Sequence, residues 1–225
     1  MASGQTCVSA KRLLVQASVY DAFAERFVAK AAGLKLGDPF AADTMIGPLV
    51  SKRSLDAASA HVAAAEADGA TVATGGARRP EDVAGDAVLA GGHFFPPTVL
   101  VDVDPAMACF QNECFAPVVT LSPFDDEAHA VALANDNDHG LGAAVWTRDV
   151  KRAHRVAANL TAGIVWCNAH HRNAPDAPWG GFGKSGVGRE NGADAQREYT
   201  APKTTIVRTS DAKEDWFANP DARYG

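Results

Sequence analysis

The sequence has few cysteines and none of the spacings that hold a metal or a dense set of disulfides. Its 225 residues contain four cysteines, and no two of them form a C-x-x-C pair. The closest two, Cys109 and Cys114, are five residues apart. Zinc ribbons and small disulfide-linked domains need closer and more numerous cysteines. We therefore expect free thiols in a reduced, cytoplasmic protein and no metal site.

Long basic clusters and long apolar runs are also missing. The chain has 21 Lys and Arg residues against 27 Asp and Glu residues, and no basic run is longer than a pair such as Arg78-Arg79. Binding to a phosphate backbone or an anionic membrane requires a concentrated positive patch. No apolar run approaches the roughly 18 residues of a membrane span, and no signal peptide opens the chain. We expect neither nucleic acid nor a membrane as a partner.

The first half of the chain predicts strands and two amphipathic helices. The first helix should follow a cap at Ser18 and end at Gly33, and the second should run from a cap at Ser51 to Gly69. A long surface loop joins them. Strands are expected at Leu13–Val15, Thr71–Ala73 and Val99–Val101, and an irregular segment at Gly75–Gly92.

The second half of the chain alternates strands with helices. Helices should open at Asp125 and Asp149, where each carboxylate can accept hydrogen bonds from free N–H groups. The strands should be Val118–Leu121, Ala143–Trp146 and Ile164–Trp166, with both tryptophans in the core. Strands that alternate with helices predict right-handed crossovers and a parallel sheet. The predicted fold class is therefore α/β, with a mostly parallel sheet and flanking helices.

Cys7 is a candidate nucleophile because small and polar residues lead up to it. Gly4, Gln5 and Thr6 precede the sulfur, whereas an inert core cysteine is expected to have apolar neighbours. A thiolate is the reactive form, and a polar, partly open site favours it. A lone cysteine is more often a small buried hydrophobic residue than a nucleophile, so other parts of the chain must decide.

The segment Gly181–Gly186 has the spacing G-x-G-x-x-G and ends like a phosphate-binding loop. A P-loop would need a glycine where Pro178 stands, and a dinucleotide fingerprint should follow a strand directly. Here Asn168–Trp179 intervenes. A backbone turn that passes close to another element is the favoured interpretation.

Two histidines and two further residues have ordinary structural explanations. His170 and His171 are adjacent, and on an extended segment their side chains would point in opposite directions, which makes a shared metal improbable. They should face solvent or line a pocket. Taken alone, Glu113 would be a solvated loop acid and Phe115 a core ring.

Five ordered segments together are far more specific than any one of them. They are Gly4–Cys7 (GQTC), Gly47–Ser51 (GPLVS), Asn112–Val118 (NECFAPV), Gly163–Asn168 (GIVWCN) and Pro178–Glu190 (PWGGFGKSGVGRE). In this order they resemble the NAD(P)-dependent aldehyde dehydrogenase superfamily, over nearly the whole chain. The resemblance implies that the chain is the C-terminal catalytic-domain portion of such an enzyme, beginning just before the nucleophilic cysteine.

The resemblance implies a role for three residues. Cys7 matches the nucleophile that attacks the aldehyde carbon, giving a thiohemiacetal that loses hydride to the nicotinamide and a thioester that water hydrolyses. Glu113 matches the acid that holds the nicotinamide ribose, and Phe115 matches the ring beside the nicotinamide. The implied cofactor is NAD or NADP, and the implied substrate is a small aldehyde that the sequence cannot name.

The resemblance also implies a domain organisation. Residues 1–200 would form the catalytic domain, and residues 201–225 an oligomerisation strand and tail, with Thr204–Val207 pairing across subunits. Pro178–Glu190 would be a turn near the substrate entrance. The expected partners are further copies of the chain or a separate upstream half.

Some features depart from the family pattern. Ala116 stands where the family often has Gly, and Ser54 where many members have Gln. The family's cofactor domain, general-base glutamate and oxyanion-hole asparagine lie upstream of the nucleophile, and only six residues precede Cys7. We expect the chain alone to be poorly active. A non-catalytic remnant that self-associates or pairs with a full-length relative, and a thiol hydrolase that would need a histidine near Cys7, are the alternatives.

Overall fold

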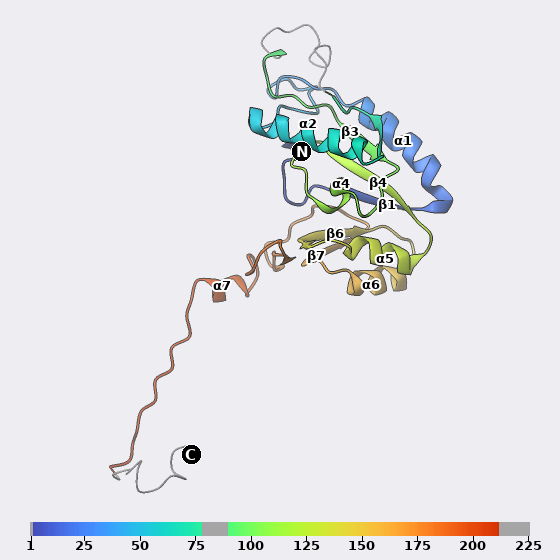
Figure 1. The fold of residues 1–225 in the computed structure, drawn as a ribbon. Coiled ribbons are helices and arrows are strands. Elements are labelled where there is room, and N and C mark those ends of the chain that lie inside the picture. The colour runs from blue at the N-terminus through green and yellow to red at the C-terminus, as the bar shows by residue number, and fades with distance from the viewer. Residues whose placement is uncertain (1, 78–89, 212–225) are drawn as a thin grey trace.

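The computed structural model describes residues 2–77 and 90–211, which form an α/β body followed by an extended tail (Figure 1). A four-stranded sheet has the order β1-β4-β3-β2. Its strands are β1 (Arg12–Gln16), β4 (Val118–Phe124), β3 (Thr98–Val101) and β2 (Thr71–Thr74). β4 runs parallel to both β1 and β3, and only β2 is antiparallel. The predicted α/β class with a mostly parallel sheet is confirmed.

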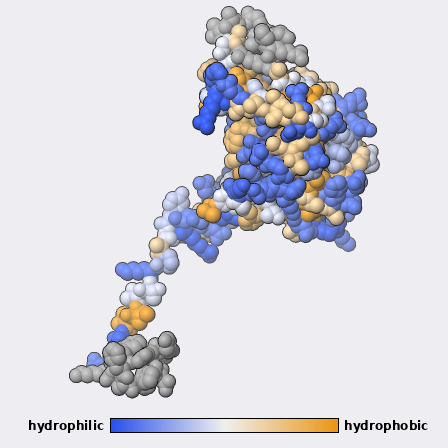
Figure 2. All heavy atoms as spheres, in the orientation of Figure 1, coloured by the Kyte–Doolittle hydropathy of each residue, from blue (hydrophilic) through white to orange (hydrophobic). Residues whose placement is uncertain are grey.

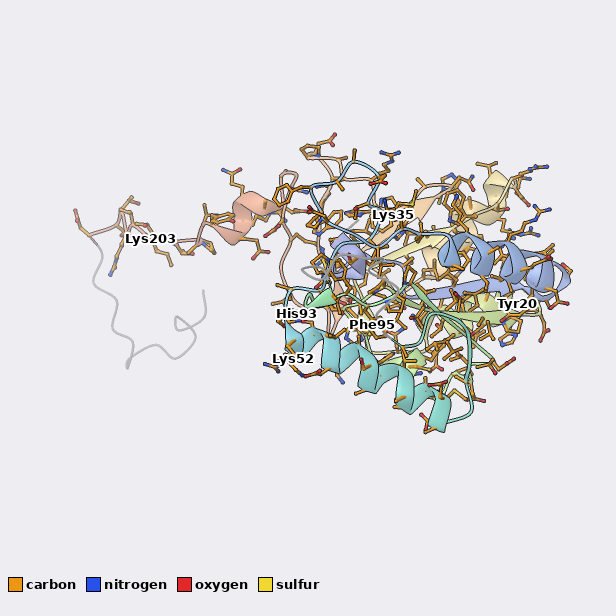
Figure 3. The ribbon with its side chains drawn as sticks, turned by 90° about the horizontal axis from the view of Figure 1, so that it is seen from above. Tyr20, Lys35, Lys52, His93, Phe95 and Lys203 are labelled. Atoms are coloured by element: carbon orange, nitrogen blue, oxygen red, sulfur yellow. The ribbon has the colours of Figure 1, made fainter. Side chains whose placement is uncertain are left out.

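Two helices cover opposite faces of this sheet, α1 (Tyr20–Ala32) and α2 (Lys52–Ala67). Successive side chains of a strand point to opposite faces. In β3, Val99 accordingly packs in the cluster that contains α1 residues, and Leu100 in the cluster that contains α2 residues. Both are fully buried. Figure 3 shows Phe95, just before β3, inside this body, and Lys52 at the start of α2. Parallel strands need such cover on both faces.

The predicted helix caps are confirmed at two positions. The hydroxyl of Ser51 accepts from the backbone N–H of Ser54 at the start of α2. The Asp149 carboxylate accepts from two N–H groups in the first turn of α6 (Val150–Asn159). The predicted ends at Gly33 and Gly69 also hold, since the first caps α1 and the second follows α2 with a positive φ.

Two predicted helix starts are wrong. A short 3-10 turn, Ala17–Val19, takes the place of the cap expected at Ser18, and α1 then begins without a side-chain cap. The helix α5 (Glu127–Asn135) is capped by Asp126, which accepts from the His129 N–H, rather than by Asp125. At α5 two adjacent aspartates could serve as the cap, whereas at α1 the N-cap position is taken by Val19, which has no capping group.

The predicted parallel sheet of the second half is divided in two. β6 (Gly142–Val145) pairs in parallel with β7 (Ile164–Cys167), and α6 connects them as predicted. β4 does not join them, because β1 and β3 already occupy both of its edges. A further small sheet consists of β5 (His139–Gly140) and β8 (Phe182–Gly183).

The two tryptophans of this half differ. Trp166 is buried on β7, as predicted, with 7% of its surface exposed. Trp146 follows the end of β6 and is 68% exposed, so its assignment to the core was wrong. Cys167, at the end of β7, is exposed as well. A strand that pairs on one edge only can leave the residues at its end uncovered.

The tail after the short helix α7 (Ala195–Glu198) extends away from the body (Figure 1). Lys203 lies on it, well separated from the sheet in Figure 3. Thr204–Val207 forms no strand within the single chain, so the predicted pairing across subunits stays a prediction. The tail carries a hydrophobic patch in Figure 2, and Ile206 and Val207 are 90% and 74% exposed.

Parts of two expectations lie outside the described residues. They are most of the irregular segment at Gly75–Gly92 and the end of the tail. Among the described residues, no helix is long and apolar enough to cross a membrane. The described residues also include the 3-10 turn Ala2–Gly4 and the short helix α4 (Ala108–Gln111).

Candidate active site

The exposed thiol of Cys7 lies on a loop that is hydrogen-bonded to the second sequence segment, Gly47–Ser51. Ser3, buried and in a left-handed conformation with φ of 50°, donates to the Gly47 carbonyl at 2.8 Å. The Gln5 side chain accepts from the Val50 N–H at 2.8 Å and donates to the Pro48 carbonyl at 3.4 Å. The segments GQTC and GPLVS, 43 to 45 residues apart, are therefore joined through side chain to backbone contacts.

The third segment approaches the same loop from another side. Gly4 has a φ of +74°, and a Cβ added there would lie 2.2 Å from the Ala116 carbonyl oxygen. Only glycine fits so close a backbone approach. The Lys11 ammonium donates to the carbonyls of both Gly4 and Ala116, at 2.6 and 2.7 Å. The Cys7 loop and the NECFAPV loop are thus in direct contact.

His170, two residues after the fourth segment, contacts the residue after Cys7. Its Nε2 lies 2.9 Å from the Val8 carbonyl oxygen. A carbonyl can only accept, so Nε2 carries the hydrogen and Nδ1 is left without one in the neutral ring. The imidazole also makes an edge contact with Trp166 at 5.2 Å between centroids. The sequence had assigned no histidine to the surroundings of Cys7.

His171 does not point away from His170. The two rings meet edge to face with centroids 6.4 Å apart, because His171 has a left-handed backbone with φ of 52° instead of an extended one. The expectation of opposite directions was therefore wrong. Among the described residues no three His, Cys, Asp or Glu side chains gather as a metal site would require.

Glu113 and Phe115 open onto a hollow of about 380 Å³ next to α2. Phe115 is 47% exposed and is not a core ring. Its ring therefore offers a free face, and Ser54 and His61 add polar groups to the same hollow. Cys7 does not line it; the Cys7 loop meets this region through the contact of Gly4 with Ala116.

Burial and charge shift the proton affinities of this region. Partial burial raises the pKa of Glu113, against the opposing positive charges of His139 and Lys11. Burial lowers the pKa of His61, and the charge of Lys11 lowers it further. Burial raises the pKa of Cys114, so this thiol stays protonated more readily than an exposed one. Burial in this region disfavours the charged forms of Glu113, Cys114 and His61, and the positive charge of Lys11 partly offsets this effect for Glu113 and Cys114.

The glycine-rich segment is a structural turn, as its context indicated. Lys184 forms an ion pair with Asp138 at 2.7 Å, and Ser185 accepts from the Gly140 N–H at 2.9 Å. Both side chains that would contact a phosphate in a P-loop are therefore engaged with the β5 segment.

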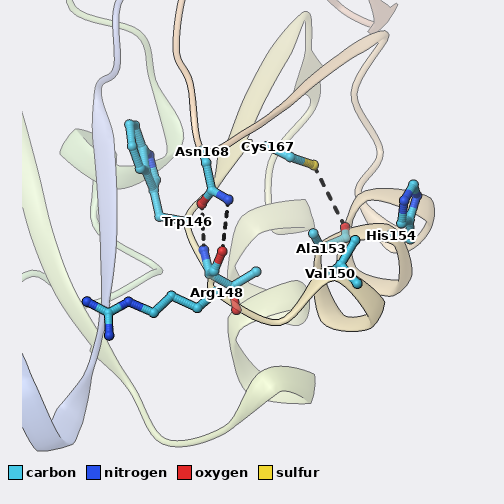
Figure 4. Close-up of a pocket in the computed structure, with 8 residues that line it drawn as sticks. Trp146, Arg148, Val150, Ala153, His154, Cys167 and Asn168 are labelled. Atoms are coloured by element: carbon cyan, nitrogen blue, oxygen red, sulfur yellow. Dashed lines mark hydrogen bonds between the residues drawn. The ribbon is translucent and has the colours of Figure 1, made fainter.

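A larger hollow, of about 720 Å³, lies at the end of β6 and β7, and none of the predicted site residues lines it. Figure 4 shows Trp146, His154 and Cys167 around it. The Asn168 side chain makes two hydrogen bonds to the backbone of Thr147, at 2.9 and 2.8 Å, and these hold the ends of the two strands together. The exposed strand ends at Trp146 and Cys167 form part of the lining of this hollow.

Sequence reasoning missed two residues that organise the site, Lys11 and His170. Lys11 stands outside the quoted segments, and nothing in its spacing marks it. His170 was noted, but its contact partner is 162 residues away. Neither contact could be found without the three-dimensional arrangement.

Comparisons with known proteins agree with this arrangement. A family model described as "Aldehyde dehydrogenase family" matches residues 1–205. An aldehyde dehydrogenase of Emericella nidulans is 43% identical over 93% of this chain, and a betaine aldehyde dehydrogenase of Bacillus subtilis is 39% identical over 96%. These alignments cover 40% and 43% of the two relatives, so the chain spans less than half of their length.

A solved structure matches the fold closely. It is a mutant betaine aldehyde dehydrogenase of Staphylococcus aureus in complex with NAD+, and it carries a BME-modified cysteine. The TM-score is 0.91 at 38% sequence identity, over 97% of this chain and 43% of that one.

Proposed function

The chain belongs to the aldehyde dehydrogenase family, and on that premise we propose that it carries the nucleophile and the nicotinamide end of a site that oxidises an aldehyde to a carboxylic acid with NAD+ or NADP+. The observation that carries the proposal is the convergence of three separated segments, Gly47–Ser51, Asn112–Val118 and the loop of His170, on the loop of one exposed thiol, Cys7. The convergence rests on the hydrogen bonds of Ser3, Gln5, Lys11 and His170.

Cys7 would act as the nucleophile. Its thiolate adds to the aldehyde carbon and forms a thiohemiacetal, and water later hydrolyses the thioester to release the acid. The supports on three sides of the loop restrict its movement, and a fixed nucleophile lowers the entropic cost of reaching the attacking geometry. The thiol is exposed, as attack on a small substrate requires.

Glu113 and Phe115 would hold the nicotinamide end of the cofactor. The hollow beside them suits a ring and a ribose: Phe115 offers an exposed aromatic face, and the Glu113 carboxylate can accept from ribose hydroxyls. When bound, the dinucleotide accepts a hydride from the substrate. NAD+ is bound in the S. aureus relative, which favours NAD+ for this chain.

The isolated chain should turn over slowly. The resemblance places the general base and one oxyanion-hole donor upstream of the nucleophile, and the chain covers about 40% of its relatives. Loss of one such donor costs about 10²- to 10³-fold, and loss of a positioned base about 10²- to 10⁴-fold. A partner chain that supplies those groups would restore the rate.

The test follows NADH and NADPH formation with a panel of aliphatic, aromatic and quaternary-ammonium aldehydes. We expect a weak rate that Cys7→Ser abolishes. The matched control is Cys167→Ser, which alters the other exposed thiol, in a hollow that none of the predicted site residues lines. Turnover that survives Cys7→Ser, or that is lost equally in Cys167→Ser, would refute the role of Cys7. Robust turnover by the wild-type chain alone would show that the missing groups come from within it.

The alternative is a non-catalytic remnant that self-associates or pairs with a full-length relative. The observation in its favour is the tail, which carries two exposed aliphatic side chains, Ile206 and Val207, away from the body. A complete absence of Cys7-dependent turnover, combined with stable association, would favour this alternative. A free-standing thiol hydrolase would require Cys7-dependent ester hydrolysis without cofactor. It would also need a histidine base, and His170 contacts the carbonyl of the residue after Cys7.

A further inference from the structure

Lys11 joins the two loops on which the proposed site depends. It directly precedes β1, and its half-buried side chain reaches back to the Gly4 carbonyl and across to the Ala116 carbonyl, 105 residues away. Both N–H···O distances, 2.6 and 2.7 Å, are short, as expected for a charged donor. One ammonium group thus holds two backbone segments from separate parts of the chain.

We propose that Lys11 is a positioning residue, which sets the separation between the Cys7 loop and the loop of Glu113 and Phe115. This inference rests on the proposed function. Gly4 is three residues before Cys7, and Ala116 directly follows Phe115. A substrate carbon on Cys7 and a ring beside Phe115 would therefore be placed relative to each other through Lys11.

The contact is tight enough to define a distance. The missing Cβ of Gly4 allows the Ala116 carbonyl to approach to a distance that no other residue would permit. Ala116 is 1% exposed, and its carbonyl also accepts from the Val118 N–H at 2.8 Å, so Lys11 supplies its charged donor. Loss of a charged donor at a buried carbonyl, where water has little access, is unfavourable. Removal of the ammonium should therefore separate the loops and admit solvent.

The surroundings explain why a lysine is suited to this position. Burial lowers the pKa of Lys11, while the negative charges available at Cys114 and Glu113 act in the opposite direction. The charge of Lys11 also lowers the pKa of His61 on α2, in addition to the effect of burial. The ammonium form provides donors for both carbonyls and compensates for the charge of Glu113.

Cys114 provides a reporter inside the same loop. It lies between Glu113 and Phe115 and is buried, as is Cys109 in the neighbouring α4. Opening of the loop should expose Cys114 and leave Cys109 protected, whereas global unfolding should expose both. Native labelling with iodoacetamide, read by peptide mass spectrometry, measures the two rates in one sample.

The experiment compares the wild-type chain with Lys11→Met, Lys11→Arg and, as a matched surface control, Lys35→Met. In Lys11→Met we expect Cys114 to be alkylated faster by at least about tenfold, the factor that the loss of a hydrogen bond from a charged donor produces. Cys109 should stay within about twofold, the range of a neutral surface change. Lys11→Arg keeps charged donors and should restore much of the protection.

A pH profile distinguishes positioning by charge from a purely structural role. As pH rises through the pKa of Lys11, which burial lowers, the wild-type side chain loses its charge and its hydrogen bonds weaken, so the rate ratio of Lys11→Met to wild type should decrease. The titration of Cys114 itself is shared by all variants. Glu113 and His61 also face Lys11, and as a carboxyl group and an imidazole they lose their protons at lower pH than an ammonium group. Lys11→Arg should show no such weakening, since guanidinium stays charged.

Two results would overturn the inference. One is a Cys114 rate in Lys11→Met equal to that of the wild type, and the other is an equal rise at Cys109, which would make Lys11 a general stabilising residue. Gly4→Ala provides a second variant, because its Cβ would force the same loops apart while Lys11 remains. Cys114 should then be exposed again. If Cys7 proves inert in the wild type, the proposed function fails, and the Cys114 rates still decide the role of Lys11.

Discussion

The four-stranded sheet and the β6–β7 pair are built from similar strands but differ in how they are covered. The first has α1 on one face and α2 on the other, and its core includes Val99, Leu100 and Leu121 at 0% exposure. The second has one crossover helix. In this helix and the two strands together, three side chains are buried: Ala153, Val156 and Trp166. Beyond it, the described tail is exposed throughout.

The difference indicates which region sets the site and which is available for partners. Cys7 and Glu113 lie on the loops that lead into β1 and β4, so the well-covered sheet defines their geometry. The β6–β7 pair provides His170, which then contacts the Cys7 loop. A two-stranded parallel sheet is rarely stable by itself. We infer that its exposed edges and the tail are the surfaces that association would cover.

Truncation of one large aromatic residue in each region should give the largest contrast. Phe95→Ala removes a ring with 0% exposure next to β3, and such core truncations cost about 3–5 kcal/mol in the free energy of unfolding. Trp146→Ala, at the exposed end of β6, should cost less than about 0.5 kcal/mol. Urea unfolding measures both. Equal losses would mean that the regions are equally well packed.

A proline in the tail should affect association without affecting stability. Ile206→Pro removes a backbone N–H from the exposed run that could add to another sheet, and a strand cannot pair fully without it. Light scattering should show an oligomer for the wild type and for the control Ile206→Val, and a smaller species for Ile206→Pro. The urea midpoint of the dilute chain should not change. A wild-type chain that stays monomeric at high concentration would exclude the tail as an association strand.

The smallest effect is expected at the ionic contact between the two regions. Glu127 on α5 binds Arg155 and Arg152 on α6, and hydrogen bonds from Arg155, followed by its charge and the Arg152 contacts, hold the pKa of Glu127 below its ordinary value. A carboxylate with a lowered pKa stabilises the fold above its unfolded pKa, and this contribution is lost as pH falls through the folded value.

Glu127→Gln should therefore lower the melting temperature slightly at neutral pH and make no difference in acid. Glu25→Gln is the control, an exposed helical Glu for which no ion pair is described. Because the groups are exposed, added salt should reduce the difference. A Glu127→Gln effect that persists at acid pH would show that the contact acts through packing instead of charge.

Local patterns in the sequence predicted most elements of the body. The caps at Ser51 and Asp149 and the helix ends at Gly33 and Gly69 depend on side chains and backbone within one turn, and these were correct. The division of the second sheet was not predictable in this way, because it depends on which edges of β4 were already occupied. The exposure of Trp146 followed from the same long-range fact.

The candidate site shows the same limit. Cys7, Glu113 and Phe115 came from a resemblance of ordered segments, and the structure brings their loops into one region. The resemblance did not identify Lys11 and His170 as residues that support the site. Their contacts, with Ala116 and Val8, join residues more than 100 positions apart. Hydrogen bonds to backbone carbonyls place few demands on residue type, so they leave no motif in the sequence.

The long reach of the His170 contact has a consequence for biosynthesis. Val8 leaves the ribosome 162 residues before its partner. At about 5–20 residues per second, roughly 10 to 30 seconds pass before the covering loop exists. During that interval the loop of Cys7 lacks the His170 contact that later restrains it. The geometry of the proposed nucleophile is therefore established late in synthesis.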